Sequence, residues 1–210
     1  MFQLVKYDFT EEEDEKQIQQ LWKNEIKHYS EIYSTQYFQF FHSIFVYIIL
    51  GVLLQQQKFK FFFVIVFSSI LYILLIKYYI SYSFNNLLSS EIDMKNIQEF
   101  YLSSKKNNFF LIKENEDILG FIGLEAKSKE TIEIKRLIIQ KCEKEKKFQL
   151  TEKLFEKAKQ FSKEIKMTKI ILNCSNYEEN LIHFCSSKKF ELKNTEKIKH
   201  LTCYNFEHLL

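Results

Sequence analysis

The hydrophobic pattern is clearest between residues 131 and 165. Apolar and polar side chains alternate from Thr131 to Ile139, which predicts a β-strand with one buried face. A charged turn follows at residues 140–149, and from Leu150 apolar side chains recur at helical spacing, which predicts an amphipathic helix that covers a sheet. In this order of elements, backbone N–H groups and the positive end of the helix point to one place, which favours a bound phosphate. The turn contains no glycine.

The rest of the pattern predicts a mixed α/β domain. Helical spacing predicts helices at 11–33, 93–102 and 178–187, and short apolar runs predict strands at 1–7, 109–113, 118–126, 168–173, near 190 and at 200–206. Gly120 and Gly123 lie inside one of these strands, where glycine marks a bulge or the close approach of another group. We therefore expect an α/β fold with a mixed, mainly antiparallel sheet flanked by helices.

A different pattern occupies residues 37–80. Residues 37–54 and 61–76 are almost wholly apolar, and the polar residues 55–60 separate them. Each half would cover ~24–27 Å as a helix, slightly less than the ~30 Å of a bilayer core. The apolar residues lie on every side of these helices, which favours lipid contact and predicts an inserted two-helix transmembrane hairpin. A pair of buried core helices is the alternative.

The hairpin divides the expected chain into three parts. Residues 1–36 form the first strand and helix of the α/β domain, residues 37–80 form the hairpin, and residues 81–210 complete the domain. Two spans return the chain to its starting side, as this arrangement requires. Gln39 and His42 are expected at the membrane interface. Lysines occur near both ends of the hairpin, so their distribution does not decide its orientation.

Composition mainly excludes classes of partner. The 30 basic and 27 acidic residues give a net charge of only +3, so no nucleic-acid partner is indicated. Cysteine occurs at positions 142, 174, 185 and 203, without the spacing of a metal site or a disulfide framework. We therefore expect reduced, mostly buried thiols and no bound metal.

Several short sequence motifs carry a family resemblance: Asp93-Met94 with Tyr101-Leu102, the glycines at 120 and 123, Arg136-Leu137, and residues 161–175. With these motifs and this order of elements, the chain resembles the GNAT acetyltransferase superfamily. It is most similar to the membrane-anchored camello-like branch, which includes cysteine S-conjugate N-acetyltransferases. In that branch too, a first strand and helix precede a hydrophobic hairpin.

The resemblance implies a site for acetyl-CoA in the turn before the long helix. The family pattern there is Gln/Arg-x-x-Gly-x-Gly/Ala, in which glycines let backbone N–H groups approach the diphosphate. The matching register places Lys144 first, Lys147 fourth and Gln149 sixth, so long side chains stand at both glycine positions. We expect Lys147 and Gln149 to fill the opening beside strand 168–173 through which pantetheine would pass. The residues implied for this degenerate cofactor site are Ile138, Ile139, Lys144, Lys146, Lys147, Phe148, Gln149 and Leu150.

The resemblance also implies two catalytic positions. Cys185 stands where the family places the tyrosine that protonates the leaving thiolate, and its alternative role is that of a small buried hydrophobic residue. Glu133 stands where many members place a base for the substrate amine, although a solvated strand residue fits the same pattern. His183 lies two residues from Cys185, on another helical face, so a Cys–His pair is not expected.

Two functional hypotheses follow. The favoured one is a membrane-anchored, degenerate acetyltransferase that binds no cofactor and acts as an accessory subunit of a membrane protein complex. The alternative is an active N-acetyltransferase that uses acetyl-CoA at a membrane surface. Both imply contact with a lipid bilayer, and the endoplasmic reticulum and the mitochondrial inner membrane are the expected locations.

Overall fold

The computed structural model describes residues 2–7, 12–54, 59–176, 178–198 and 201–210, and within these ranges it does not describe the side chains of residues 12, 33, 36–66, 68, 81, 84–85, 87–90, 198 and 201. The chain forms two compact units. The first unit combines Met1–Trp22 with Ile92–Leu210, and the second is Lys23–Glu91.

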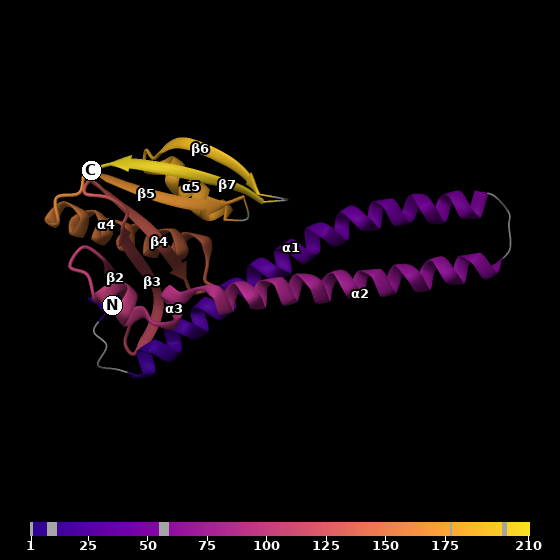
Figure 1. Cartoon of the computed structure of the whole chain (residues 1–210), viewed down its shortest axis with the longest axis horizontal. Coiled ribbons are helices and arrows are strands. Elements are labelled where there is room, and N and C mark those ends of the chain that lie inside the picture. The colour runs from indigo at the N-terminus through magenta and orange to yellow at the C-terminus, as the bar shows by residue number, and fades with distance from the viewer. Residues whose placement is uncertain (1, 8–11, 55–58, 177, 199–200) are drawn as a thin grey trace. The chain divides into compact units, whose positions relative to one another are not determined.

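A seven-stranded sheet forms the centre of the first unit (Figure 1). Its strands are β1 (Phe2–Lys6), β2 (Asn108–Glu114), β3 (Asp117–Ala126), β4 (Thr131–Ile139), β5 (Lys169–Ser175), β6 (Glu191–Ile198) and β7 (Leu201–Leu209). They lie in the order β1-β2-β3-β4-β5-β7-β6. Among the described pairs only β4 and β5 are parallel. The predicted mixed, mainly antiparallel sheet is therefore confirmed.

Helices cover this sheet. Those assigned to the first unit beyond α1 are α3 (Ile92–Lys95), the short π-helix η1 (Gln98–Leu102), α4 (Lys144–Glu164) and α5 (Glu179–Ser187). Helix α4 packs against β2, β3 and β4 through Leu150, Leu154, Phe155 and Ala158, which are all fully buried. Burial of these side chains removes apolar surface from water and holds α4 in one position over the sheet.

The two strand glycines permit close packing, as predicted. A Cβ at Gly123 would lie 2.7 Å from the Tyr101 ring, and one at Gly120 would lie 2.6 Å from the carbonyl oxygen of Ile138. The pairing of β3 with β4 also shifts register beside Gly123, so β4 bulges at this point.

The parallel pair opens at one end. Thr131–Ile134 of β4 pair with Lys169–Leu172 of β5, whereas β4 continues to Ile139 and β5 to Ser175 without a described pairing between them. The two central strands therefore part towards the end of β4 from which the chain enters α4. This opening positions the candidate site.

The second unit consists of the later part of α1 (Glu12–Leu54) and α2 (Phe59–Ser90) (Figure 1). The sequence predicted one helix at 11–33 and a separate one from residue 37. A single helix covers both, because the chain has no proline and residues 34–36 do not break it.

The prediction that this hairpin spans a membrane is not supported by the structure. In the described parts of α1 and α2, and in the other described helices, no stretch is long and apolar enough to cross a bilayer. Gln39 and His42, the residues expected at the membrane interface, have side chains outside the described set.

Candidate functional site

The site begins at the first turn of α4. The sequence predicted a turn up to Gln149, but the helix starts at Lys144, because residues 144–149 are mostly good helix formers. Glu143 precedes the helix with an extended ψ of 146°, and its carbonyl accepts a hydrogen bond from the N–H of Lys147 at 2.8 Å. The first N–H groups of a helix have no carbonyl partner within it, so the start of α4 presents free donors and positive potential.

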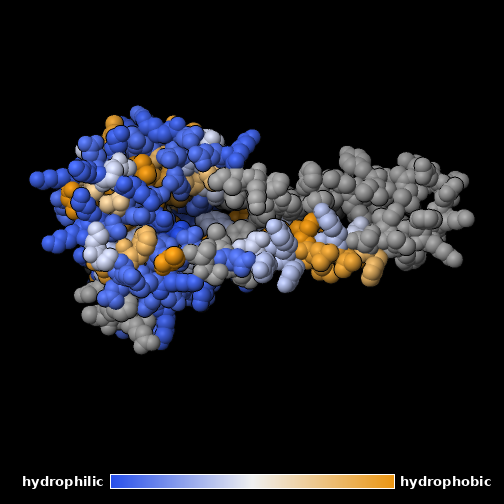
Figure 2. All heavy atoms as spheres, in the orientation of Figure 1, coloured by the Kyte–Doolittle hydropathy of each residue, from blue (hydrophilic) through white to orange (hydrophobic). Residues whose placement is uncertain are grey.

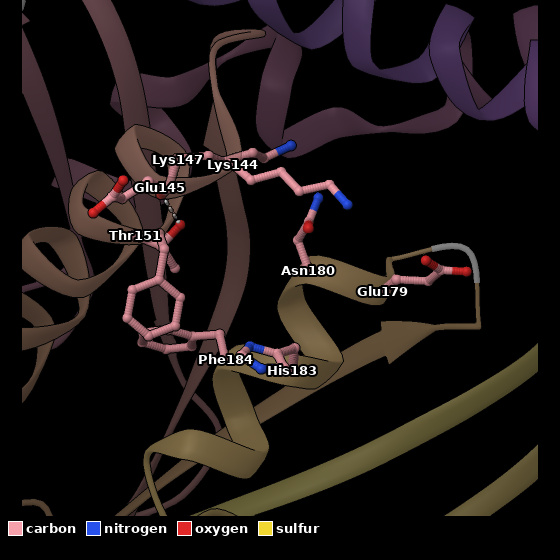
Figure 3. Close-up of a pocket in the computed structure, with 9 residues that line it drawn as sticks. Lys144, Glu145, Lys147, Thr151, Glu179, Asn180, His183 and Phe184 are labelled. Carbon is pink, nitrogen blue, oxygen red and sulfur yellow. Dashed lines mark hydrogen bonds between the residues drawn. The ribbon is translucent and has the colours of Figure 1, made fainter.

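A cavity of about 660 Å³ lies beside this turn. We call it the α4 cavity; its walls come from α4 and α5, namely Lys144, Glu145, Lys147, Phe148, Thr151, Glu179, Asn180, His183 and Phe184. In Figure 3 the side chains of Lys144 and Lys147 extend towards Asn180, whereas the carboxylates of Glu145 and Glu179 point away from them. The two ammonium groups therefore face the open space.

The lack of glycine does not distort the turn. Among the described residues, only Asn115, Lys166 and Lys189 have a positive φ outside glycine. The backbone from Gln140 through the first turn of α4 therefore uses torsions that any residue can adopt.

The predicted cofactor residues separate into three groups. Lys144, Lys147 and Phe148 line the α4 cavity. Lys146 instead lies 3.5 Å from the carboxylate of Glu114 and 5.3 Å from the ring centre of Phe2, and Gln149 is exposed outside the cavity. The others, Ile138, Ile139 and Leu150, are buried. Lys147 thus lines the α4 cavity, whereas Gln149 does not.

Solved structures share the fold of this chain. A GNAT-family acetyltransferase from Staphylococcus aureus matches with a TM-score of 0.57 and 15% identity, over 100% of this chain and 99% of its own. An acetyltransferase from Streptococcus agalactiae matches with a TM-score of 0.50 and 22% identity, over 59% of this chain and 78% of its own. The chain has the GNAT fold.

A third GNAT-fold neighbour carries a ligand. It is a Bacillus anthracis protein solved in complex with acetyl coenzyme A, with a TM-score of 0.50 and 17% identity, over 54% of this chain and 69% of its own. No protein-family model matches the sequence, and no curated protein matches it. At these identities the neighbours establish the fold alone.

Cys185, the candidate acid, does not line the α4 cavity. Its side chain is fully buried in the core, and burial, with Glu178 nearby, raises the pKa of the thiol to about 12. A buried thiol with this pKa holds its proton at neutral pH. Its burial matches the alternative role of a small hydrophobic residue.

Glu133, the candidate base, is buried at the parallel pair. Its Oε1 accepts a hydrogen bond from Nδ2 of Asn173 at 2.8 Å, and its Oε2 lies 2.9 Å from the ammonium of Lys127. Ile132 and Ile134, its neighbours along β4, belong to the core that α4 covers. The carboxylate therefore lies on the opposite face of the sheet, with a cation already beside it.

Asn180 and His183 are among the residues of the site that sequence reasoning missed. Both lie on α5, and His183 also packs edge-on against Phe148 with ring centres 6.2 Å apart. Asn180, His183 and Phe184 are spaced by three and four residues, so they share one face of the helix. That spacing was visible in the sequence, but His183 was considered only as a partner for Cys185.

Proposed function

We propose that this chain is an acetyl-CoA-dependent N-acetyltransferase and that the α4 cavity holds the diphosphate of the coenzyme. The observation that carries the proposal is the open cavity at the N-terminus of a GNAT-fold helix, with two lysine ammonium groups facing it. A diphosphate placed there meets N–H donors, a positive helix end and two cations, which is a favourable combination for an anion.

The residues that would hold the coenzyme can be named. The backbone N–H groups of the first turn of α4 would donate to phosphate oxygens, and Lys144 and Lys147 would supply charge. Asn180 would contribute a neutral donor from α5. The opening between β4 and β5 offers a path towards Glu133 on the sheet. When bound, acetyl-CoA supplies a thioester that an amine can attack.

A second candidate function is the degenerate, accessory protein. Two observations favour it: the thiol of Cys185 is buried away from the α4 cavity, and the carboxylate of Glu133 is held by Asn173 and Lys127. A chain with these features would lack efficient proton transfer, with or without a bound coenzyme. Its cofactor cavity would then serve stability or assembly with other subunits.

Association with a membrane is part of both proposals. Five apolar side chains of α2 are 50–71% exposed: Phe67, Ile70, Leu71, Leu74 and Leu75. Figure 2 shows apolar spheres gathered along the described part of this helix. Tyr78, Tyr79 and Tyr82 follow, all more than half exposed, and tyrosine is favoured at the bilayer surface. The endoplasmic reticulum and the mitochondrial inner membrane are the proposed locations.

An acetyl-transfer assay tests the enzyme proposal. The full chain is incubated with radiolabelled acetyl-CoA and a panel of small amine conjugates and lysine peptides. Transfer should be lost at low coenzyme concentration in Lys147→Gln and kept in Lys163→Gln, an exposed lysine at the far end of α4. Coenzyme binding without transfer to any amine would favour the degenerate protein instead.

A further inference from the structure

A second cavity, of about 670 Å³, lies near the β1 edge of the sheet. We call it the β2 cavity. It is lined by the end of β1, the segment between η1 and β2, and one residue of α4: Lys6, Tyr7, Leu102, Ser103, Ser104, Lys105, Asn107, Asn108 and Phe161. The two cavities share no lining residue. The acetyl-CoA proposal does not use this space.

The wall of the β2 cavity contains a buried amide with an unused donor. Asn108 is only 4% exposed, and its Oδ1 accepts a hydrogen bond from the N–H of Phe109 at 2.9 Å. That bond fixes which side-chain atom is oxygen, so Nδ2 carries the N–H donors. Nδ2 donates no hydrogen bond to another described residue. Nδ2 is not among the fully enclosed polar atoms, so a ligand in the cavity can reach it and accept its hydrogen bond.

Further donors surround this amide. Ser104 Oγ accepts a hydrogen bond from the N–H of Lys106 at 3.3 Å, and in the described part of the chain its hydroxyl donates none. Burial, with Glu15 and Asp14 nearby, raises the pKa of Tyr7 to about 12, so its phenol keeps its proton at neutral pH. The Ser104 hydroxyl carries a proton that a ligand oxygen can accept.

The described lining of the β2 cavity carries only positive charge. Lys6 and Lys105 line it, and none of its described lining residues is acidic. Of the two carboxylates that act on Tyr7, Asp14 is paired with Lys113 at 2.6 Å, and neither belongs to the cavity wall. Leu102 and the ring of Phe161 add apolar surface. The lining thus combines N–H and O–H donors, two cations and an apolar wall.

We propose that the β2 cavity binds a small organic anion, with a phosphate or carboxylate group on an apolar body. Asn108 Nδ2, the Ser104 hydroxyl and the Lys105 ammonium bind the anionic oxygens, and Phe161 packs against the apolar part. This site is separate from the coenzyme site, so its occupant is a second ligand of the same chain. The proposal does not depend on catalysis at the α4 cavity.

Calorimetric titration of the full chain with phenyl phosphate, benzoate and phenol tests this proposal. Either anion should bind with one-to-one stoichiometry in the Lys147→Gln chain, in which the α4 cavity lacks one of its cations, and neutral phenol should bind at least tenfold more weakly. Asn108→Asp keeps the acceptor for Phe109, removes the donor and places a negative charge beside the anion, so it should weaken binding at least tenfold. Lys105→Gln, at an exposed lysine, should weaken it about threefold or more.

Two matched variants separate the possible outcomes. Lys129→Gln, in an exposed turn outside both cavities, should bind the anion like the wild type. Lys147→Gln should also leave this binding unchanged. The proposal is overturned if neither anion binds saturably, if phenol binds as tightly as the anions, or if Lys147→Gln alone abolishes binding. Unchanged binding in a folded Lys105→Gln variant would also overturn it.

Discussion

Arg136 holds both carboxylate oxygens of Asp93. Its Nε donates to Oδ2 at 2.9 Å and a terminal nitrogen donates to Oδ1 at 2.8 Å, while the hydroxyl of Tyr101 donates to the same Oδ2 at 2.8 Å. The guanidinium also lies 4.8 Å from the ring centre of Trp22. Asp93 is buried, so this network joins α3 and η1 to β4 through charges removed from water.

Removing the carboxylate should therefore destabilise the first unit strongly. Asp93→Ala leaves the Arg136 guanidinium without its partner and should lower the free energy of unfolding by about 3–5 kcal/mol. Tyr101→Phe removes one hydrogen bond and should cost about 1–3 kcal/mol. Urea unfolding of the two variants measures both changes. A loss below 1 kcal/mol for Asp93→Ala would show that the pair contributes little.

The contact between Gly123 and the Tyr101 ring gives a second prediction. An added Cβ would lie 2.7 Å from the ring, so Gly123→Ala should lower the free energy of unfolding by about 1–3 kcal/mol through overpacking. Tyr101→Leu in the same chain removes the clashing ring, so the two costs should be less than additive. Simple additivity in the double variant would contradict a direct clash.

The strand β4 and the helix α4 show what the sequence could and could not predict. The alternation of apolar and polar residues predicted a strand at Thr131–Ile139, and β4 has the same bounds. The start of α4 was missed because residues 144–149 carry no apolar stripe and only their helix propensity marks them. Strand β6 was expected only near residue 190, since an exposed edge strand needs no buried face.

The candidate site was harder to predict than the fold. Adjacent residues of a helix point about 100° apart, so the direction of each side chain is known only once the helix is known to include it. In α4, Lys147 faces the α4 cavity, whereas Lys146 lies beside Glu114. The second wall comes from α5, more than thirty residues later, and no local pattern joins the two helices. Cys185 was placed at the acid position by register alone, which does not indicate which way the thiol points.

The buried thiol of Cys185 predicts a pH dependence of stability. A thiol in the unfolded chain loses its proton near pH ~8.5, whereas burial raises the pKa of Cys185 in the folded chain to about 12. Above pH ~8.5 the unfolded state therefore binds fewer protons, and stability should fall as pH rises, by up to ~1.4 kcal/mol per pH unit for this group.

Unfolding by urea at pH 8, 9 and 10 measures this effect. The free energy of unfolding should fall less steeply in Cys185→Ala than in the wild type, because the variant lacks the titrating thiol. Lysine and tyrosine titrations are common to both chains and cancel in the comparison. If the free energy of unfolding falls equally steeply with pH in both chains, burial does not raise the pKa of Cys185.

The exposed apolar side of α2 predicts binding to membranes. Leu71→Lys places a charge among the apolar residues and should reduce cosedimentation with phospholipid vesicles, at a cost of ~2.5–3.5 kcal/mol if the residue lies near the bilayer centre. Leu192→Lys is the matched control, because Leu192 on β6 has a similar exposure, 53% against 50%. Equal cosedimentation of both variants and the wild type would remove the membrane proposal.

Binding of acetyl-CoA tests the account most directly, through the thermal unfolding of the full chain. Acetyl-CoA at ~100 times its dissociation constant should stabilise the fold by ~2.7 kcal/mol and raise the unfolding midpoint. S-acetylpantetheine, which has no diphosphate, should raise it much less at the same concentration. Lys147→Gln should reduce the shift with acetyl-CoA, and Lys163→Gln should not. An unchanged midpoint of the wild-type chain at millimolar acetyl-CoA would contradict the proposal that the α4 cavity is a coenzyme site.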